Sequence, residues 1–331
     1  MKLKTRLFLL PCLIVLASCS SYKRNAFLEK GDNDGRFNFE NGEYDKALDY
    51  LAEYNQKNDQ KDYIFTDDRC EKIKVRVRDL MKWNYWSIEV KVNDIPMEFL
   101  LDTGAWWSSL SYDGVKLFGK NFDDVPAAQN ESDWFVFFPK TFSFGNVCFS
   151  YPEFFSAQLN SRTGTYGNLG LGYLFYYFDS FTLDLKNKAI ILNDDIPDVK
   201  GVKADTEYGQ LVIPIEIGGK TYNAMLDTGN SVNFTFVDLW DEQIEKYEFK
   251  VNTYEGERNF LESQSKVNDI AVCEGVIEKL VFHLVHETDS DIYNGINDCG
   301  IDIILGPEFF LKARITVDTK NKLCYVVPNG K

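Results

Sequence analysis

Asp102 and Asp227 are the two residues of this chain whose type and setting best suit chemistry. Each ends an apolar run and begins the tripeptide Asp-Thr-Gly. Glycine lets the backbone turn tightly and approach another segment closely. Two carboxyls held about 3 Å apart cannot both ionise, so they share one proton. Such a pair can accept a proton from water through one member and donate a proton through the other.

The elements that must position the two carboxylates occur twice in the chain. Residues 90–104 align without gaps on residues 215–229, at an offset of 125 residues, from 102 to 227. Farther along, Gly172 and Gly306 each follow a leucine and lie 12 residues before Asp184 and Asp318. The sequence therefore predicts one unit used twice. Its short apolar or alternating runs, broken by turn residues, are typical of an all-β lobe.

From about Trp83 to Lys331, these repeated motifs resemble the pepsin and retropepsin superfamily of aspartic proteases. The resemblance implies an all-β, bilobal, pepsin-like fold with a short helical N-terminal extension. It also implies that Asp102 and Asp227 are catalytic. In that family, threonine hydroxyls lock the two turns together and glycine amides help to hold the carboxylates. The matching positions are Thr103, Thr228, Gly104 and Gly229.

The resemblance also implies a hairpin flap over the cleft. By position, the flap of the first lobe turns at residues 130–133, beside Trp134, and Tyr254 and Gly256 occupy the comparable place in the second lobe. We expect these three residues to contact substrate. The family's usual flap tyrosine followed by glycine is absent from the first lobe, so the sequence leaves substrate preference open. Trp106 suits a pocket wall or core packing equally well.

The residues directly after the two motifs are Ala105 and Asn230. Many pepsin relatives carry serine or threonine there, and its hydroxyl can donate to the catalytic carboxylate. Alanine offers no side-chain donor, so the ionised pair loses stabilisation. We therefore expect the pair to hold its shared proton to higher pH. The side-chain amide of Asn230 could replace one hydroxyl.

The predicted organisation has four parts: a lipoprotein signal peptide (1–19), a tether with a helical extension (20–83), a first protease lobe (84–198) and a second (199–331). Apolar residues at helical spacing predict a helix over 43–55. Val75 and Val77 alternate with charged residues, which predicts an early strand of the protease body.

The N-terminus predicts export. A basic start is followed by an apolar run, residues 7–17, which is too short to span a bilayer. The run ends in Leu-Ala-Ser-Cys, which resembles a bacterial lipobox with Cys19 as the lipidated residue. This predicts a protein anchored by an N-terminal lipid to a bacterial membrane, at the cell surface or the periplasmic face. The alternative is an ordinary signal peptide in which Cys19 has no role.

Other chemistries find little support in the sequence. A net charge of −15 disfavours nucleic acid as a partner, because phosphates would be repelled. There is no Cys-x-x-Cys pair and no Gly-x-Ser-x-Gly elbow. His283 and His286, the only histidines, face opposite sides of an expected strand and make a poor metal pair. The glycine-rich run 167–172 lacks the spacing of a dinucleotide loop. We expect no metal and no cofactor.

The leading hypothesis is an aspartic endopeptidase that acts on peptide or protein substrates. Because one chain carries both motifs, we expect a monomer. Two alternatives stay open: a protein that holds peptides in the same cleft without cutting them, and a surface interaction lipoprotein in which the N-terminal helix is the working part.

Overall fold

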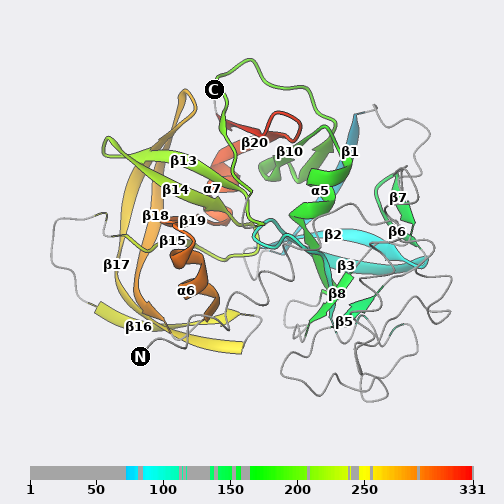
Figure 1. Cartoon of the computed structure of the whole chain (residues 1–331), viewed down its shortest axis with the longest axis horizontal. Coiled ribbons are helices and arrows are strands. Elements are labelled where there is room, and N and C mark those ends of the chain that lie inside the picture. The colour runs from blue at the N-terminus through cyan, green and yellow to red at the C-terminus, as the bar shows by residue number, and fades with distance from the viewer. Residues whose placement is uncertain are drawn as a thin grey trace, which may run out of the picture.

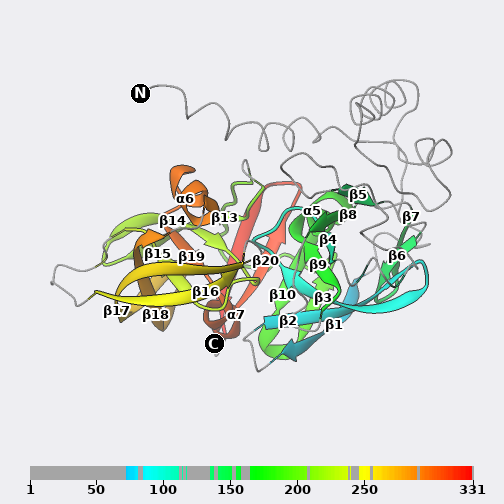
Figure 2. The ribbon, with the colours of Figure 1, turned by 90° about the horizontal axis from the view of Figure 1, so that it is seen from below.

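The structure, a computed structural model, describes residues 72–80, 85–111, 114, 117, 135–137, 141–150, 154–157, 165–206, 209–237, 239, 246–253, 256–288 and 291–329. These residues form mostly β-strands and a few short helices, which confirms the predicted β class. The strands make a closed barrel and a larger mixed sheet that lie side by side (Figures 1 and 2). Cys19 and the helix predicted at 43–55 lie outside the described residues.

The barrel belongs to the second repeat, defined here as residues 212–328. Its six strands are, in spatial order, β13 (Val212–Ile217), β14 (Lys220–Leu226), β19 (Ile303–Leu305), β15 (Asn233–Thr235), β18 (Gly275–Thr288) and β17 (Gly256–Val272). Pairing of β13 with β17 closes the ring. Strand β16 (Lys246–Thr253) extends β17 outside the ring.

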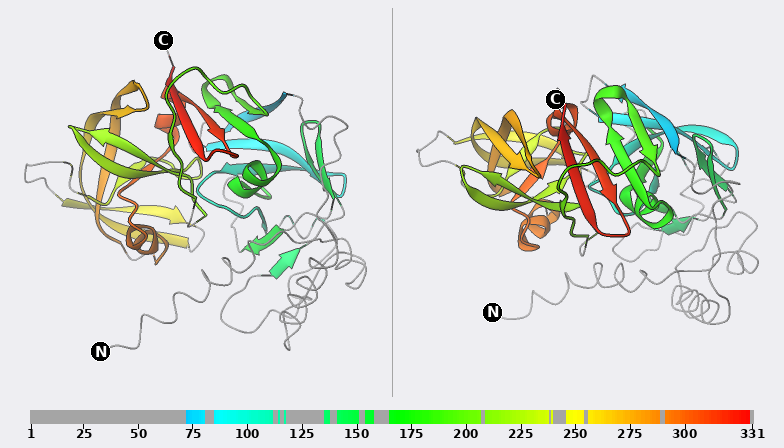
Figure 3. Two further views of the ribbon diagram at one scale, coloured as in Figure 1. Left: turned by 45° about the horizontal axis from the view of Figure 1, so that its top comes forward. Right: turned by 90° about the horizontal axis from the view of Figure 1, so that it is seen from above.

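The larger sheet contains strands from both repeats, the first repeat being residues 85–192. Its main path is β12 (Val202–Lys203), β21 (Leu323–Pro328), β20 (Ala313–Asp318), β10 (Ser180–Asp184), β11 (Ala189–Leu192), β1 (Ile73–Leu80), β2 (Tyr85–Val92), β3 (Ile95–Asp102), β9 (Gly167–Gly170), β4 (Ser109–Ser111), β8 (Phe154–Ala157) and β5 (Phe135–Phe137). Strand β6 (Thr141–Phe144) pairs with β2 and with β7 (Val147–Ser150). In Figure 3, β20 and β21, in red, lie between the barrel and the green strands of the first repeat.

Strand β1 confirms the strand predicted from alternation. Val75 and Val77 are buried, whereas Lys74, Arg76 and Arg78 are exposed. The strand pairs with β11 through its first half and with β2 through its second half. The strand precedes residue 84, and through these two pairings it is part of the larger sheet, as the sequence predicted.

The two repeats meet along β10 and β20, which pair antiparallel. Thr182 lies opposite Thr316, and their hydroxyl oxygens are 2.8 Å apart. The turns that follow these strands are alike: Asn187 donates to Asp184 at 2.9 Å, and the equivalent Asn321 donates to Asp318 at 2.7 Å. This part of the sequence repeat is therefore also a structural repeat.

The helices are short and mark the repeat again. They are α5 (Leu171–Tyr177), η3 (Leu185–Asn187), α6 (Asp291–Asp298) and α7 (Pro307–Lys312). Helix α5 begins directly after Gly170, and α7 begins directly after Gly306. Within the described part of the chain, no helix is both long and apolar enough to cross a membrane.

Aromatic rings fill the core of the first repeat. The ring of Phe142 lies 5.9 Å from Phe99, 5.8 Å from Phe149, 5.0 Å from Phe154 and 5.5 Å from Tyr173. All five side chains are buried. Because Phe99 belongs to β3, this cluster fixes the strand that ends in the first carboxylate.

Candidate active site

Asp102 and Asp227 emerge from equivalent strands. Strand β3 ends in Asp102 and runs parallel to β9, with Asp102 opposite Gly170. Asp227 directly follows β14, which runs parallel to β19, and its N–H donates to the carbonyl of Leu305 at 2.9 Å. Each carboxylate thus directly follows a buried leucine, Leu101 or Leu226, at the end of its strand, where the chain turns away into Thr-Gly.

Thr103 and Thr228 connect the two turns by four reciprocal hydrogen bonds. The hydroxyl of Thr103 donates to the carbonyl of Leu226 at 2.8 Å and accepts from the N–H of Thr228 at 3.0 Å. The hydroxyl of Thr228 donates to the carbonyl of Leu101 at 2.7 Å and accepts from the N–H of Thr103 at 3.0 Å. Both threonines are buried, so these bonds are shielded from water and hold the two turns in one fixed arrangement.

Each glycine of the motifs packs against the opposite carboxylate. A Cβ on Gly104 would lie 2.6 Å from Oδ2 of Asp227, and a Cβ on Gly229 would lie 2.6 Å from Cγ of Asp102. No real side chain tolerates such contacts. The structure therefore brings together all six residues of the two predicted motifs, with the two carboxyls adjacent to each other.

The hydrogen bonds that the two carboxylates accept differ. Asp102 accepts at Oδ2 from the side-chain amide of Asn168 at 3.1 Å and at Oδ1 from the N–H of Ala105 at 3.2 Å. Asp227 accepts at Oδ1 from the N–H of Gly229 at 2.8 Å. The side-chain nitrogen of Asn230 is buried and reaches no acceptor among the described residues. Within the part of the chain that is described, a side-chain amide therefore donates to Asp102 and none donates to Asp227.

Burial shifts the titration of both carboxyls upward. Asp102 and Asp227 are half-buried, and loss of hydration raises the pKa of Asp102. Burial, reinforced by the charge of Asp102, raises the pKa of Asp227 to about 8. Two adjacent carboxyls of this kind titrate as a pair and hold one proton over a broad pH range. The pair can therefore both accept and donate a proton near neutral pH.

Two residues near the pair were missed by sequence reasoning. Asn168 lies in the glycine-rich run that the sequence offered only as a rejected dinucleotide loop. Tyr85 begins β2, and burial, then the charge of Asp227, raises the pKa of its hydroxyl, while a hydrogen bond with Ser231 opposes the rise. No sequence signal singles out Tyr85, because a tyrosine at the start of a strand is ordinary.

The structure corrects one landmark of the repeat. Gly170, not Gly172, is the counterpart of Gly306. A Cβ on Gly170 would lie 2.6 Å from the carbonyl carbon of Trp107, and a Cβ on Gly306 would lie 2.8 Å from that of Val232, 125 residues later. The chain carries Leu-Gly twice in succession there, and the gap-free alignment selected the wrong copy.

The residues predicted to contact substrate are only partly described. Gly256 is the first residue of β17 and pairs with Thr253 of β16, so it lies at the end of that hairpin. Trp134 and Tyr254 lie outside the described residues. Trp106 packs against the hydrophobic core, with its ring 5.6 Å from that of Phe175, which favours the core-packing interpretation.

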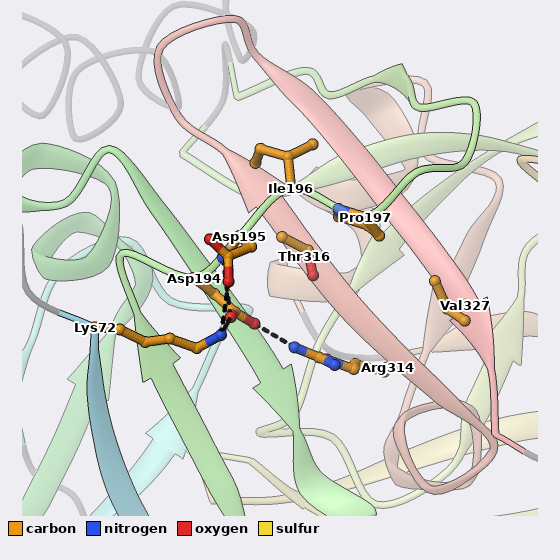
Figure 4. A pocket seen from close by; sticks show the side chains of 8 residues that line it. All are labelled: Lys72, Asp194, Asp195, Ile196, Pro197, Arg314, Thr316 and Val327. Carbon is orange, nitrogen blue, oxygen red and sulfur yellow. Dashed lines mark hydrogen bonds and ion pairs between the residues drawn. The ribbon is translucent and has the colours of Figure 1, made fainter.

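A separate cavity of about 290 Å³ lies at the junction of β1 with the segment that links the repeats (Figure 4). Its charged residues form a cluster: Lys72 and Arg314 both pair with Asp194, and Lys72 also reaches Asp195 at 3.1 Å. Burial raises the pKa of Asp194, but hydrogen bonds from Lys72, Thr182 and Arg314 outweigh it and leave the pKa below its usual value. This cluster ties β1 to the linking segment and includes neither carboxyl of the pair.

Two further features of the described residues concern metal ligands and disulfides. No group of three or more histidine, cysteine, aspartate or glutamate side chains there could hold a metal ion. The structure shows no disulfide among Cys148, Cys273, Cys299 and Cys324, the four cysteines it describes.

Comparison with known proteins adds no relative: no protein-family model matches the chain, and no curated protein matches it.

Proposed function

We propose that the chain is an aspartic endopeptidase that cleaves peptide bonds with water activated by Asp102 and Asp227. One observation carries the proposal. Two carboxyls from equivalent turns lie against each other, are fixed by the Thr103–Thr228 bonds, and have pKa values raised so that they share a proton. A carboxyl pair that shares one proton is suited to activating water for direct attack on a carbonyl carbon.

The proposed reaction uses the pair as base and acid. The ionised carboxylate accepts a proton from water while the water oxygen attacks the peptide carbonyl carbon. The protonated carboxyl gives its proton to the carbonyl oxygen. The resulting tetrahedral diol then collapses: the C–N bond breaks, the leaving nitrogen gains a proton from the protonated carboxyl, one diol hydroxyl gives its proton to the ionised carboxyl, and a carboxylic acid remains. No covalent bond to the enzyme forms at any step.

The finer fold assignment belongs to the same proposal. We assign residues 84–198 and 199–331 to two lobes of a pepsin-like fold, with β1 added to the first. The internal repeat, the reciprocal threonine bonds and the pairing of β10 with β20 support this assignment. Since one chain supplies both carboxyls, the active unit is a monomer.

The proposed substrate contacts rest on the protease resemblance, and the proposed location rests on the lipobox pattern at the N-terminus. Trp134, Tyr254 and Gly256 are proposed to border a peptide or protein substrate, and Cys19 is proposed to carry the lipid that holds the exported protein on a bacterial membrane. Cys19→Ala should move the protein from the membrane fraction to the soluble fraction. Unchanged partitioning would rule out the lipid anchor.

The direct test is digestion of an unfolded protein or a peptide library, with and without a statine-type inhibitor that mimics the tetrahedral intermediate. We expect cleavage that the inhibitor blocks. Tight inhibitor binding without cleavage would replace the proposal with a peptide-binding function. If the protein neither cleaves peptides nor binds the inhibitor, the carboxyl pair has no part in its function. That outcome would favour the interaction lipoprotein.

A further inference from the structure

Asn168 connects the Asp102 carboxylate to the backbone of β4. It is buried in β9, and its side-chain nitrogen donates to Oδ2 of Asp102 at 3.1 Å. Its side-chain oxygen accepts from both the N–H and the hydroxyl of Ser109, at 2.8 and 2.5 Å. Every polar atom of this amide group is therefore engaged.

The backbone fixes which end of the amide faces Asp102. The N–H of Ser109 can only donate, so the atom of Asn168 that faces it must be the oxygen. The NH2 group is then directed at Oδ2 of Asp102, and this carboxylate oxygen must accept. A proton on Oδ2 would point at the NH2 group of Asn168, which is itself a donor, so no hydrogen bond could form. The shared proton of the pair is therefore excluded from Oδ2 of Asp102.

In the described part of the second repeat, no such donor is found. Asn168 stands two residues before Gly170, and the residue two before Gly306 is Ile304, which is fully buried among apolar side chains. The side-chain amide nitrogen of Asn230 reaches no acceptor within the described structure, and its oxygen accepts from the N–H of Ser231 at 2.9 Å. Among the described residues, Asp227 therefore has backbone donors alone.

We propose that Asn168 is a positioning residue that keeps Asp102 as the ionised member of the pair and leaves the shared proton on Asp227. The proposal rests on the proposed peptidase function and deepens it, because it assigns the two roles. Asp102 accepts the proton of the attacking water, and Asp227 donates to the carbonyl oxygen of the substrate.

The electrostatics of the site agree with this assignment. Burial raises the pKa of both carboxyls, but the Asn168 bond, two backbone N–H groups and a hydrogen bond from Asp227 all act to lower that of Asp102. For Asp227, burial and then the charge of Asp102 raise the pKa, and three backbone N–H groups oppose the rise without a side-chain donor among the described residues to help them. The other titratable group that acts on the pair, within the described residues, is the Tyr85 hydroxyl, whose own raised pKa keeps it neutral near pH 7.

The first experiment uses the unmodified full-length chain and needs no substrate. The side-chain amide of Asn168 and the carboxyl carbons of both aspartates are followed by NMR across pH. We expect the Asp102 carboxyl and the Asn168 amide to titrate together in the lower step, and the Asp227 carboxyl to dominate the upper step. An Asn168 amide that does not respond to the lower step, or a reversed order of the carboxyls, overturns the proposal.

The second experiment removes the donor. Asn168→Leu keeps the approximate volume and should raise the lower apparent pKa of the pair by about one pH unit, because a hydrogen bond to a charged group is lost. Adding Ala105→Ser to that variant supplies a hydroxyl donor and should restore part of the shift. Ser109→Ala, which leaves the Asn168–Asp102 bond in place, is the matched control and should move the lower pKa far less. Equal shifts in both single variants would assign Asn168 a structural role only.

The two proposals fail in different ways. If the titration follows the expected order but no peptide is cleaved, the role of Asn168 stands and the peptidase function is wrong. If peptides are cleaved but Asn168→Leu leaves the lower pKa and the acid limb of kcat/KM unchanged, the function stands and the role of Asn168 is wrong. Should Asn168→Leu fail to fold, the measurement on the unmodified chain still decides.

Discussion

The two Asp-Thr-Gly turns share a backbone and differ in the side chains around it. In the first repeat, the N–H of Gly170 donates to the hydroxyl of Ser108 at 2.9 Å. In the second, the N–H of Gly306 donates to the side-chain oxygen of Asn233 at 2.8 Å, and Asn233 lies 125 residues after Ser108. The same backbone group is satisfied at the same place by a different residue type.

At the carboxylates, by contrast, the two repeats do not provide equivalent hydrogen bonds. The position two residues before the equivalent glycines is polar in the first repeat, Asn168, and apolar in the second, Ile304. Hydrogen bonds that close a turn are thus repeated in both halves, whereas, among the described residues, a side-chain amide donates to a carboxylate in the first half only. A duplicated scaffold can therefore hold two identical acids in unlike electrostatic surroundings.

The largest effect is expected when the two carboxyls are removed one at a time. Asp102→Asn and Asp227→Asn should each lower kcat/KM by about a thousandfold or more, because each removes one partner of the proton exchange. Peptide cleavage assays would measure this, with Asp184→Asn, in a turn outside the pair, as the matched control. Activity recovered on mixing the two inactive variants would contradict a monomeric site.

The pH dependence of stability should separate the two acids. In the folded chain the pKa of Asp227 is raised to about 8, so between about pH 4 and 8 the folded state binds more protons than the unfolded state. Stability must then fall as pH rises through that range. Asp227→Asn should flatten this fall and raise the free energy of unfolding at pH 8 by roughly 3 kcal/mol.

Asp102→Asn should flatten the same profile less, because burial of Asp227 remains. Urea denaturation at pH 4, 6 and 8 measures the three profiles. An equal effect of the two substitutions would mean that the carboxyls are electrostatically equivalent. That result would contradict the unlike surroundings described for the two repeats.

Two glycines test whether the backbones are truly equivalent. Gly170→Ala and Gly306→Ala each place a methyl group against a main-chain carbonyl and should each reduce the free energy of unfolding by about 3 kcal/mol. Gly295 lies in α6 and meets nothing within 4 Å at the Cβ position, so Gly295→Ala is a matched control that should be neutral or slightly stabilising. A large cost at one of the two glycines only would break the structural equivalence.

The threonine bonds should show the smallest effect and the most even one. Thr103→Val and Thr228→Val each leave a buried N–H and a buried carbonyl without a partner, which should cost about 2 kcal/mol in either repeat. Thr103→Ser retains the hydroxyl and should lose much less. Thermal unfolding measures the series, and a difference above about 1 kcal/mol between the two valine variants would show that the turns are not interchangeable.

Much of the site could be predicted because its residues recur in register. Two copies of one motif located the carboxyls, the threonines and the glycines, and alternation located β1. Asn168 could not be found in this way, since its donor bond depends on the parallel pairing of β9 with β3, which the sequence does not state. The assignment of Gly172 as the counterpart of Gly306 was wrong because the two repeats differ in length there. Gly170 lies 14 residues before Asp184, whereas Gly306 lies 12 residues before Asp318.

The contact between Thr182 and Thr316 is of a kind that identical partners can make with each other. Directly opposed residues of an antiparallel strand pair are related by a local two-fold axis, so in a symmetric homodimer the residue at that point meets its own copy. A hydroxyl both donates and accepts, so threonine can bond to threonine there, whereas two lysines or two ionised carboxylates would repel. A chain of half this length could form the same central strand pair with a second copy of itself, because nothing in the contact requires the partners to differ.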